Sequence, residues 1–172
     1  GKIAGIGFSE IAPASLRRAT AIGPVDAVQS EYSLWTRQPE LGLAQTCREL
    51  GVTLVAYSPL GRGMLVDQTP DPAKFADTDF RKINPLFLPP NFALNLRKLA
   101  GFKTYAADHG LSSAALAIAW CLAKGEHVIP IPGTRKADHL TQCAAGAAFD
   151  LTDTMLAEIK AILPVGWAYG DR

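Results

Sequence analysis

Polar and aromatic side chains stand at the ends of four apolar segments, where together they could hold one large ligand. An amide, a flat ring, a hydroxyl and a cation suit a ligand that carries a carboxamide, an aromatic ring and a phosphate. Each end taken alone has an ordinary explanation, since strands become polar where they leave the core. The four ends supply Ser9 and Glu10, then Gln29, Ser30 and Glu31, then Tyr57 and Ser58, and finally Gly133, Thr134 and Arg135.

The turn at Gly133, Thr134 and Arg135, within the stretch HVIPIPGTRKADHL, is the most specific of these ends. Glycine lets the backbone approach a ligand closely, and the free N–H groups at the start of a following helix favour an anion. Thr134 can cap that helix or offer its hydroxyl, and Arg135 and Lys136 add positive charge at the same place. The alternative is a routine strand-to-helix turn with two solvated cations.

The other titratable residues form no familiar metal-binding or nucleophilic pattern. His109, His127 and His139 lack metal-ligand spacing, and neither HExxH nor paired CxxC occurs. Asp77 and Asp79 lie in a polar stretch and are expected to be solvated. No Gly-x-Ser-x-Gly turn is present. We therefore expect neither a metal site nor a nucleophilic serine.

Four apolar segments are predicted to be buried strands, and each is followed by a helical pattern. Such alternation indicates a parallel sheet covered by helices, either doubly wound or closed as a barrel. A doubly wound dinucleotide fold would carry Gly-x-Gly-x-x-Gly after a strand, and its absence favours a barrel or part of one. The predicted strands are 2–8, 25–32, 52–58 and 127–133, and the helices that follow are 13–23, 38–51 and one from Thr134.

A long connection, residues 59–92, follows the third predicted strand and departs from this alternation. It holds six prolines between Pro59 and Pro90 and shows little periodicity. Loops longer than about 12 to 15 residues are usually functional or disordered. Helices are predicted again at 91–110, at 112–125 with Ser112 as cap, and at 152–163 with Thr152 or Asp153 as cap.

The composition is that of an ordinary globular domain without a general affinity for anionic partners. The 172 residues are 48% hydrophobic, and 17 Lys and Arg against 16 Asp and Glu leave a net charge of +1. We expect no nucleic-acid partner and no membrane span, since the apolar run at 114–123 is shorter than the roughly 18 residues required. The odd, widely spaced Cys47, Cys121 and Cys143 predict reduced thiols in a cytoplasmic protein, and no targeting peptide is visible.

Five stretches of the sequence resemble the second half of the aldo-keto reductases, in the same order and with matching spacing. They are KIAGIGFSE, AVQSEYSLWTRQPE, CRELGVTLVAYSPLGRG, LAIAWCLAKGEHVIPIPGTRKADHL and AEIKAILPVG. The resemblance covers essentially the whole chain and is strongest to bacterial members with YSPLGRG and IPGTR. It implies a TIM (β/α)8 barrel of which residues 1–172 form about strands five to eight, and hydride transfer between NADPH and a small-molecule aldehyde or ketone.

The resemblance also implies which residues hold the nicotinamide. Ser9 and Gln29 match the family residues that bind its carboxamide. Tyr57 matches the tyrosine whose ring stacks on the nicotinamide. Glu10 is part of the same site and stands where many members have Asn.

The rest of the NADP site is implied in the same way. Ser58, Pro59, Leu60, Gly61 and Gly63 match the loop along the pyrophosphate. The segment at the adenosine 2′-phosphate is matched by Gly133, Thr134 and Arg135, with Lys136 as a second cation. The adenosine side is matched by His139, Gln142 and Cys143, and many members have Asn at the last position.

The family's catalytic Tyr, Lys, His and Asp come from the first half of the barrel, and none of them is matched here. Because hydride transfer to a carbonyl needs an acid near the developing alkoxide, we expect no reductase activity from this chain alone. The expected partner is the N-terminal half of the barrel or a second half-barrel, and we favour a segment of a longer enzyme over a truncated product. The alternatives are a cofactor-sensing regulatory or channel-associated subunit without catalysis, and a self-associating half-barrel without ligand.

Overall fold

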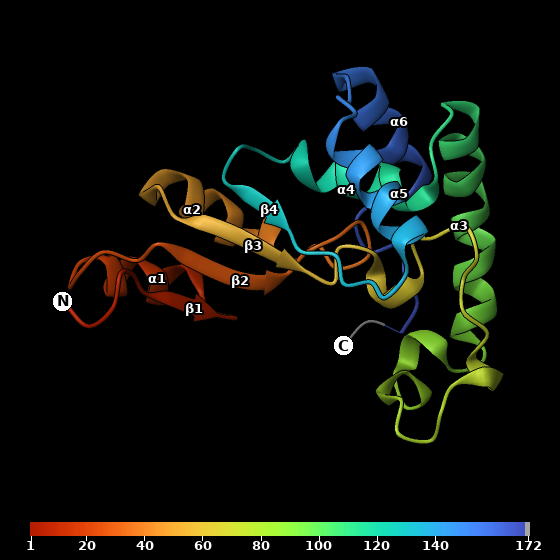
Figure 1. The fold of residues 1–172 in the computed structure, drawn as a ribbon, viewed down its shortest axis with the longest axis horizontal. Helices are drawn as coiled ribbons and strands as arrows, with labels where there is room; N and C mark the ends of the chain where they lie inside the picture. The colour runs from red at the N-terminus through yellow and green to blue at the C-terminus, as the bar shows by residue number, and fades with distance from the viewer. Residues whose placement is uncertain (171–172) are drawn as a thin grey trace.

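Four strands form one parallel sheet in the computed structural model, which describes residues 1–170. Their order in space is their order in the sequence, β1-β2-β3-β4 (Figure 1). Sequential parallel order is that of a barrel wall, whereas a doubly wound sheet reverses direction. The strands are β1 (Gly7–Ser9), β2 (Ala27–Glu31), β3 (Thr53–Tyr57) and β4 (Val128–Pro130).

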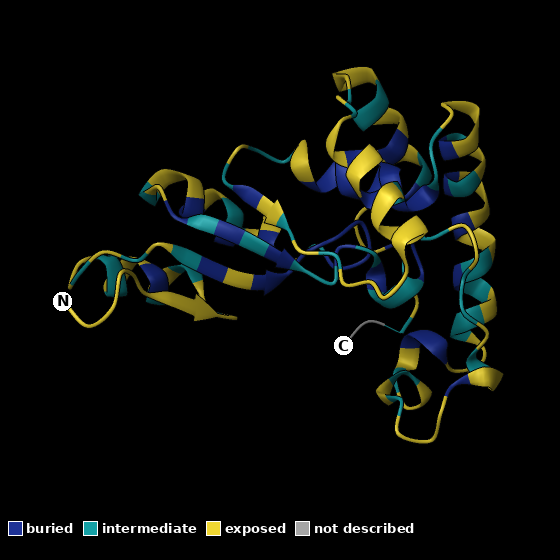
Figure 2. Ribbon diagram, in the orientation of Figure 1, coloured by how far each residue is buried: buried dark blue, intermediate teal, exposed yellow. Residues whose placement is uncertain are grey.

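The two faces of this sheet differ in what covers them. Leu54 is fully buried and its neighbour in register, Val128, is 2% exposed. The next row, on the opposite face, holds Gln29, Val55 and Ile129, of which Ile129 is 50% exposed. Figure 2 shows this alternation of buried and exposed positions along the strands. One face is therefore packed and the other is open, as in a barrel wall without the wall opposite.

Two helices cover the packed face beside the first strands. They are α1 (Pro13–Thr20) and α2 (Leu43–Leu50), which contact each other, and α2 also contacts β3. Leu16 of α1 and Cys47 of α2 are fully buried. Arg17 and Glu49 form an ion pair between the two helices.

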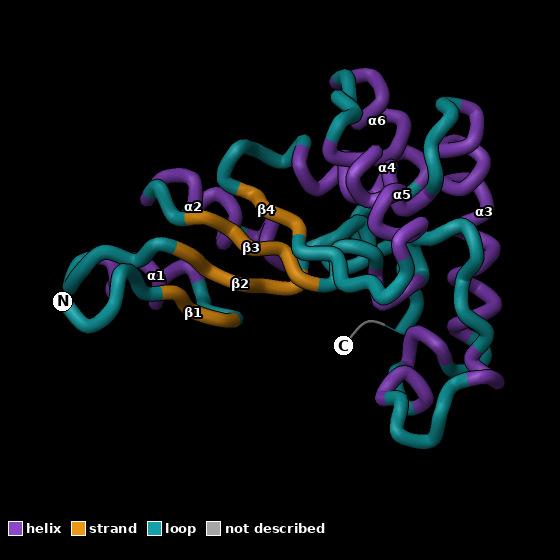
Figure 3. Tube along the Cα trace, in the orientation of Figure 1, coloured by secondary structure: helices purple, strands orange, loops and turns teal. Residues whose placement is uncertain are grey.

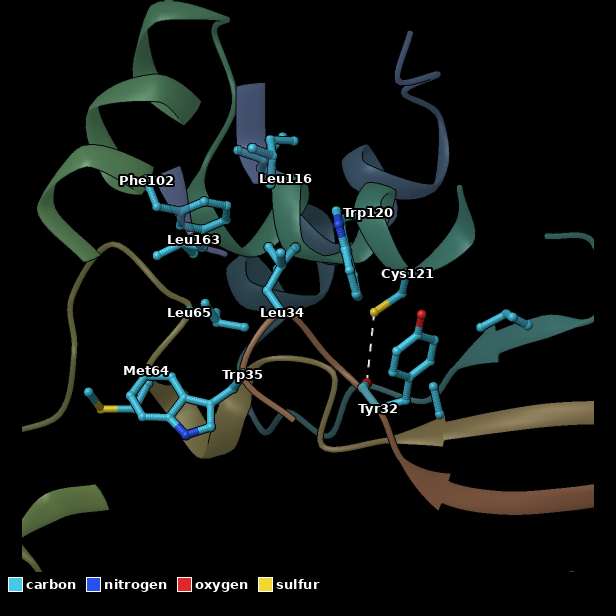
Figure 4. Packing of buried hydrophobic residues seen from close by; sticks show 14 of the residues in the cluster. Tyr32, Leu34, Trp35, Met64, Leu65, Phe102, Leu116, Trp120, Cys121 and Leu163 are labelled. Atoms are coloured by element: carbon cyan, nitrogen blue, oxygen red, sulfur yellow. Dashed lines mark hydrogen bonds between the residues drawn. The ribbon is translucent and has the colours of Figure 1, made fainter. Parts of the chain in front are cut away.

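The second half of the chain forms a helical lobe around α4 (Ser113–Leu122), which is buried on almost every side because its sequence is almost entirely apolar. At its contact with α5, a Cβ on Gly146 would lie 2.3 Å from the Ala115 carbonyl oxygen, so glycine is needed there. Figure 4 shows Leu116 and Trp120 of α4 packed in the core together with Leu34, Phe102 and Leu163. The other helices of the lobe are α3 (Asn91–Asp108), α5 (Ala137–Ala147) and α6 (Asp153–Ile162).

The predicted caps of α4 and α6 are confirmed. Ser112 Oγ accepts a hydrogen bond from the Ala115 N–H at 3.1 Å, and Thr152 Oγ1 accepts one from the Met155 N–H at 3.2 Å. Thr152, rather than Asp153, is therefore the cap of α6. Both caps satisfy an N–H that has no partner within its own helix.

Two helices differ from the prediction. The helix expected at 38–51 is divided at Gly42, whose φ of 133° is not helical, into a short 3-10 turn η1 (Gln38–Leu41) and α2. The helix expected from Thr134 begins at Ala137 instead. The Thr134 hydroxyl bonds the N–H and the carbonyl of Lys136, which is the N-cap residue, so Thr134 does not cap the helix.

Strands β1 and β4 are shorter than the predicted 2–8 and 127–133, and both lie at edges of the sheet. Before β1, the Asp26 carboxylate accepts the Ile6 N–H at 2.9 Å in place of a strand partner. After β4, Pro132 has no N–H to continue a ladder. β1 therefore begins later than predicted, and β4 ends earlier.

The long connection is built from short turns that lie beside α3 (Figure 3). It ends at Pro90, because α3 begins at Asn91. Phe87 meets Phe75 edge to face with ring centroids 5.3 Å apart, and it stacks on Phe92 with centroids 6.1 Å apart. The 3-10 turns are η2 (Gly61–Gly63), η3 (Pro72–Lys74), η4 (Phe80–Lys82) and η5 (Pro85–Phe87).

The three cysteines are free and buried, so the prediction of unpaired thiols is confirmed. Burial raises the pKa of the Cys47 thiol to about 11 and that of the Cys121 thiol to about 12. Neither is a reactive thiolate near neutral pH. Within residues 1–170, no helix combines the length and the apolar character that crossing a bilayer requires.

The difference between the two faces of the sheet can be tested by truncation. Leu54→Ala should lower the free energy of unfolding by about 2–5 kcal/mol, because it removes a fully buried side chain. Ile129→Ala should cost less than about 1.5 kcal/mol, because half of that side chain is already in water. Urea unfolding followed by circular dichroism measures both, and a larger loss at Ile129 would contradict the assignment of the packed face.

Candidate functional site

The carboxyl ends of the strands place three of the predicted site residues on the open face. Ser9 pairs with Gln29 in register, and Gln29 pairs with Val55. Because side chains alternate along a strand, Tyr57 lies on the same face as Val55 and Gln29. Ser9 and Gln29 are exposed and Tyr57 is half-buried. A hydroxyl, an amide and a phenol ring thus lie on adjacent strands at the edge where parallel α/β proteins bind ligands.

Glu10, also predicted for this site, is bound to the end of β2. Its carboxylate accepts hydrogen bonds from the Ser30 hydroxyl at 3.1 Å and the Glu31 N–H at 3.0 Å. Its own N–H donates to the Gln29 carbonyl at 2.9 Å. Glu10 therefore joins β1 to β2, and a ligand contact for it stays a prediction.

Left-handed backbone is concentrated at this edge. Among residues 1–170, the non-glycine residues with positive φ are Glu10, Ser58 and Arg62, at 52°, 50° and 58°. Each follows a strand or lies in the loop after one. Such conformations cost roughly 1–3 kcal/mol and persist where surrounding contacts hold them, which is common at functional sites.

A groove of about 660 Å³, called the main groove below, lies between the loop after β3 and the turn after β4. Gly61 belongs to that loop and is buried. A Cβ on it would come within 3.3 Å of the Trp35 side chain, and its φ is 55°. Glycine is therefore the residue that this turn accommodates. The predicted residues that line the main groove are Ser58, Pro59, Leu60, Gly63, Gly133 and His139.

A second groove of about 360 Å³, called the side groove below, shares Leu60, Gly133 and His139 with the main groove. The two grooves therefore adjoin. Val66 and Gln68 line both, and the sequence analysis missed them because the long connection lacks periodicity. The predicted residues found only in the side groove are Thr134, Gln142 and Cys143.

Arg62 lines the main groove and joins its loop to the end of β2. Its guanidinium donates to Glu31 Oε2 at 2.6 Å, and the two side chains are only 15% and 6% exposed. The Thr36 hydroxyl donates to the other Glu31 oxygen at 3.2 Å, and the guanidinium lies 5.1 Å from the centroid of the Phe80 ring. Sequence reasoning left Arg62 out of the site, although its place between two glycines of SPLGRG was an available signal.

Arg81 is the second cation of the main groove that sequence reasoning missed. It donates to Asp79 at 2.6 Å, lies 4.2 Å from the centroid of the Phe75 ring, and donates to the Arg62 carbonyl at 3.4 Å. Hydrogen bonds from Arg81 lower the pKa of Asp79 to about 2. The expectation that Asp79 is solvated is therefore wrong, because it is paired and lines the groove, whereas Asp77 is 98% exposed as expected.

The turn after β4 forms the opposite wall. Gly133 lines both grooves, and a Cβ added to it would meet no atom within 4 Å, so the backbone leaves open space there. Arg135 and Lys136 are exposed and line neither groove. Their predicted place beside a phosphate therefore stays a prediction.

Asp67 fixes the long connection against the helical lobe. Its Oδ1 accepts hydrogen bonds from the Ser113 N–H at 2.8 Å and the Ser113 hydroxyl at 2.6 Å. Its carbonyl accepts a third from Lys103 Nζ at 2.9 Å. These bonds position the neighbouring Val66 and Gln68 as a groove wall. No local signal marks Asp67, since Ser113 is 46 residues away.

The three histidines occupy different environments. His139 lines both grooves. A ring nitrogen of His109 bonds the Tyr105 carbonyl at the end of α3, and Nε2 of His127 bonds the Ala44 carbonyl beside β4. In the described part of the chain, no group of three or more His, Cys, Asp or Glu side chains could hold a metal ion.

Arg62→Met tests the buried ion pair. It removes the Arg62 charge from the buried Glu31 carboxylate and should lower the free energy of unfolding by about 3 kcal/mol. Combining it with Glu31→Gln should recover part of that loss, because the carboxylate that lost the Arg62 charge is gone. Arg97→Met, at an exposed cation of α3, is the control in urea unfolding. Equal losses for the Arg62 and Arg97 variants would be incompatible with a stabilising pair.

The sequence matches a known protein family over most of its length. The family model for the Aldo/keto reductase family matches residues 1–164. Aldo-keto reductase str7 of Strobilurus tenacellus is 39% identical over 175 residues, covering 100% of this chain and 52% of that protein. Aldo-keto reductase yakc of Schizosaccharomyces pombe, whose name specifies NADP(+), is 38% identical over 163 residues, covering 93% of this chain and 48% of that protein.

Two solved structures are similar to this chain in fold. Glycerol dehydrogenase AKR11B4 from Gluconobacter oxydans superposes with a TM-score of 0.85 at 28% identity, covering 95% of this chain and 50% of that one. The thermostable aldo-keto reductase Tm1743 superposes with a TM-score of 0.67 at 24% identity, covering 92% and 48%, and shows similarity of fold.

The matches cover almost all of this chain but only about half of each relative. The chain spans about half the length of the curated relatives it matches. The family match nevertheless covers almost the whole chain, and its strands follow one another in parallel as in a barrel wall. The chain therefore belongs to the aldo/keto reductase family.

Proposed function

We propose that this chain is the cofactor-binding half of an NADPH-dependent reductase of aldehydes or ketones, with β1 to β4 as strands five to eight of the barrel. The carrying observation is that most of the predicted cofactor residues line two adjoining grooves at the carboxyl edge of the sheet. The named NADP(+) dependence of the Schizosaccharomyces pombe relative supports this choice of cofactor.

The donors present fit the parts of a dinucleotide. Ser9 and Gln29 would hold the nicotinamide carboxamide on the open face, and Tyr57 would stack on the ring. The volumes of about 660 and 360 Å³ lie within the roughly 300–1,000 Å³ of small-molecule sites. When bound, NADPH supplies the hydride, and the chain binds and orients it.

The phosphates would lie along the main groove, where the loop from Ser58 to Gly63 presents its backbone. Arg62 and Arg81 line that groove and supply positive charge, although Glu31 and Asp79 each neutralise part of it. The adenosine would extend into the side groove, with the 2′-phosphate at the exposed Arg135. Guanidinium groups suit phosphate because they offer paired N–H donors.

No proton donor for the carbonyl is proposed within this chain. The Tyr32 hydroxyl donates to Glu40, and the Tyr105 hydroxyl donates to Glu158 at 2.6 Å. Both hydroxyl protons are therefore already used in hydrogen bonds within the chain. Burial raises the pKa of Tyr32, and burial with the Glu158 hydrogen bond raises that of Tyr105 to about 12. Neither phenol is prepared to protonate an alkoxide, which supports a catalytic acid from elsewhere.

The missing wall of the barrel is the partner that fits this chain best. β1 is an edge strand exposed along its length, and Ile3, Ile6 and Phe8 around it are 70%, 48% and 37% exposed. An uncovered apolar edge of this kind favours pairing with further strands. We propose the N-terminal half of the same barrel as partner, or else a second half-barrel, in a cytoplasmic setting that suits the free thiols.

Binding without turnover is the expected behaviour of the purified chain. NADPH should quench its tryptophan fluorescence, while mixing with an aldehyde should leave the NADPH absorbance unchanged. Turnover would overturn the proposal that the catalytic acid lies outside the chain. Failure to bind would instead remove the cofactor-binding role and favour a half-barrel without ligand.

The 2′-phosphate role of Arg135 is tested by comparing two cofactors. Arg135→Glu should weaken NADPH binding about 10- to 100-fold, as expected for the loss of a charge-assisted contact, and NADH binding much less. Arg97→Glu, a reversal at an exposed site on α3, should affect neither. Equal losses for both cofactors in the Arg135 variant would refute this role.

A further inference from the structure

A cavity of about 210 Å³ lies between α2 and the segment that joins α4 to β4. It shares no lining residue with the main groove or the side groove. Its volume is below the roughly 300 Å³ at which sites for drug-sized ligands begin, so it suits a small ligand. The side chains that define it are Tyr32, Glu40, Gln45, Arg48, Lys124 and His127.

Two cations line this cavity. Arg48 is exposed and Lys124 is half-buried, and within residues 1–170 neither forms an ion pair. The Lys124 ammonium lies 4.1 Å from the centroid of the Trp120 ring. A ring face attracts a cation but leaves its net charge in place.

The carboxylate of Glu40 is already occupied. Its Oε1 accepts hydrogen bonds from the Tyr32 hydroxyl and Arg37 Nε, both at 2.9 Å, and its Oε2 accepts one from Arg37 Nη2 at 2.7 Å. Arg37 is itself 8% exposed, and its buried Nη1 has no hydrogen-bond partner in the described chain. Glu40 and Arg37 therefore balance each other, and an N–H of the guanidinium still lacks an acceptor.

Glu49, next to Arg48 on α2, has other hydrogen-bond partners. Arg17 of α1 forms an ion pair with it, and Gln45 Nε2 donates to it at 2.7 Å. Glu49 is thus shared with α1 rather than reserved for Arg48. Hydrogen bonds from Arg17 and then Gln45 do most to lower the pKa of Glu49, and the charge of Arg48 contributes least. Arg48 and Lys124 therefore line the cavity without an ion pair among residues 1–170.

Lys124 lies near other cations and is partly removed from solvent. Burial lowers the pKa of its ammonium; Glu40 opposes this effect, and Arg37 and Lys160 add to it. Its charge is therefore only partly compensated by the protein. An anion in the cavity would offset both the lost hydration and the repulsion from the other cations.

We propose that this cavity binds a small oxyanion, with inorganic phosphate as the representative ligand, between the Lys124 ammonium and the Arg48 guanidinium. Tetrahedral oxyanions accept charge-assisted hydrogen bonds from both kinds of donor. The size of the cavity selects the free ion over a nucleotide. The site is separate from the two grooves, so the inference does not rest on the proposed function.

The test is a titration of the ¹⁵N-labelled 172-residue chain with phosphate against chloride at equal ionic strength. Phosphate should shift the amide signals of Ala44, Gln45 and His127 saturably, and chloride should not. Lys124→Gln and Arg48→Gln should each weaken the phosphate affinity about tenfold, the usual effect of losing one charge-assisted hydrogen bond. The double variant should abolish saturable shifts.

Two controls keep the outcome decisive. Lys98→Gln, at an exposed lysine of α3, should leave the affinity unchanged, and Arg81→Gln, in the main groove, should leave the shifts at Ala44 and His127 unchanged. Dispersed amide spectra of the variants, and thermal unfolding with and without phosphate, show that each variant is folded. Unsaturable shifts, or equal affinities for the Lys124 and Lys98 variants, would overturn the proposal.

Discussion

Parallel pairing of four strands in sequential order sets the geometry of the whole sheet. It brings every carboxyl end to the same edge of the sheet, where Ser9, Gln29 and Tyr57 lie on adjacent strands. Alternation along each strand sends Leu54 and Val128 under the helices and leaves the other face open. A shift of any strand by one residue would turn its side chains to the opposite face, so that Ser9, Gln29 and Tyr57 would no longer share one face.

The walls of the grooves depend on contacts between segments far apart in the chain. Arg62 reaches across 31 residues to Glu31, and Asp67 reaches across 46 to Ser113. Both bonds hold parts of a connection with no regular secondary structure beyond single 3-10 turns. The loop is therefore shaped by a few buried or charged anchors rather than by its own propensity, and the grooves exist because those anchors hold.

Some features that are decided within a few residues were predicted correctly, and others were misread. Ser112 and Thr152 cap their helices with bonds that span three residues. By contrast, Arg81 enters the main groove because it pairs with Asp79 and reaches the Arg62 carbonyl, which a reading of its polar neighbourhood as solvated missed. The start of α5 was also misplaced, since the Thr134 hydroxyl closes a turn of its own ahead of the helix.

From the sequence alone one can predict the alternation of strands and helices, the N-caps of α4 and α6, the family and the residue types at the carboxyl ends of the strands. These follow from local periodicity and from motifs such as YSPLGRG, which need no knowledge of distant contacts. The contacts in three dimensions were needed to find that Arg62 and Arg81 line a groove, that Glu10 ties β1 to β2, and that Arg48 and Lys124 form no ion pair among residues 1–170. Such outcomes depend on which oppositely charged groups meet in space, and pairing in space is set by packing rather than by sequence separation.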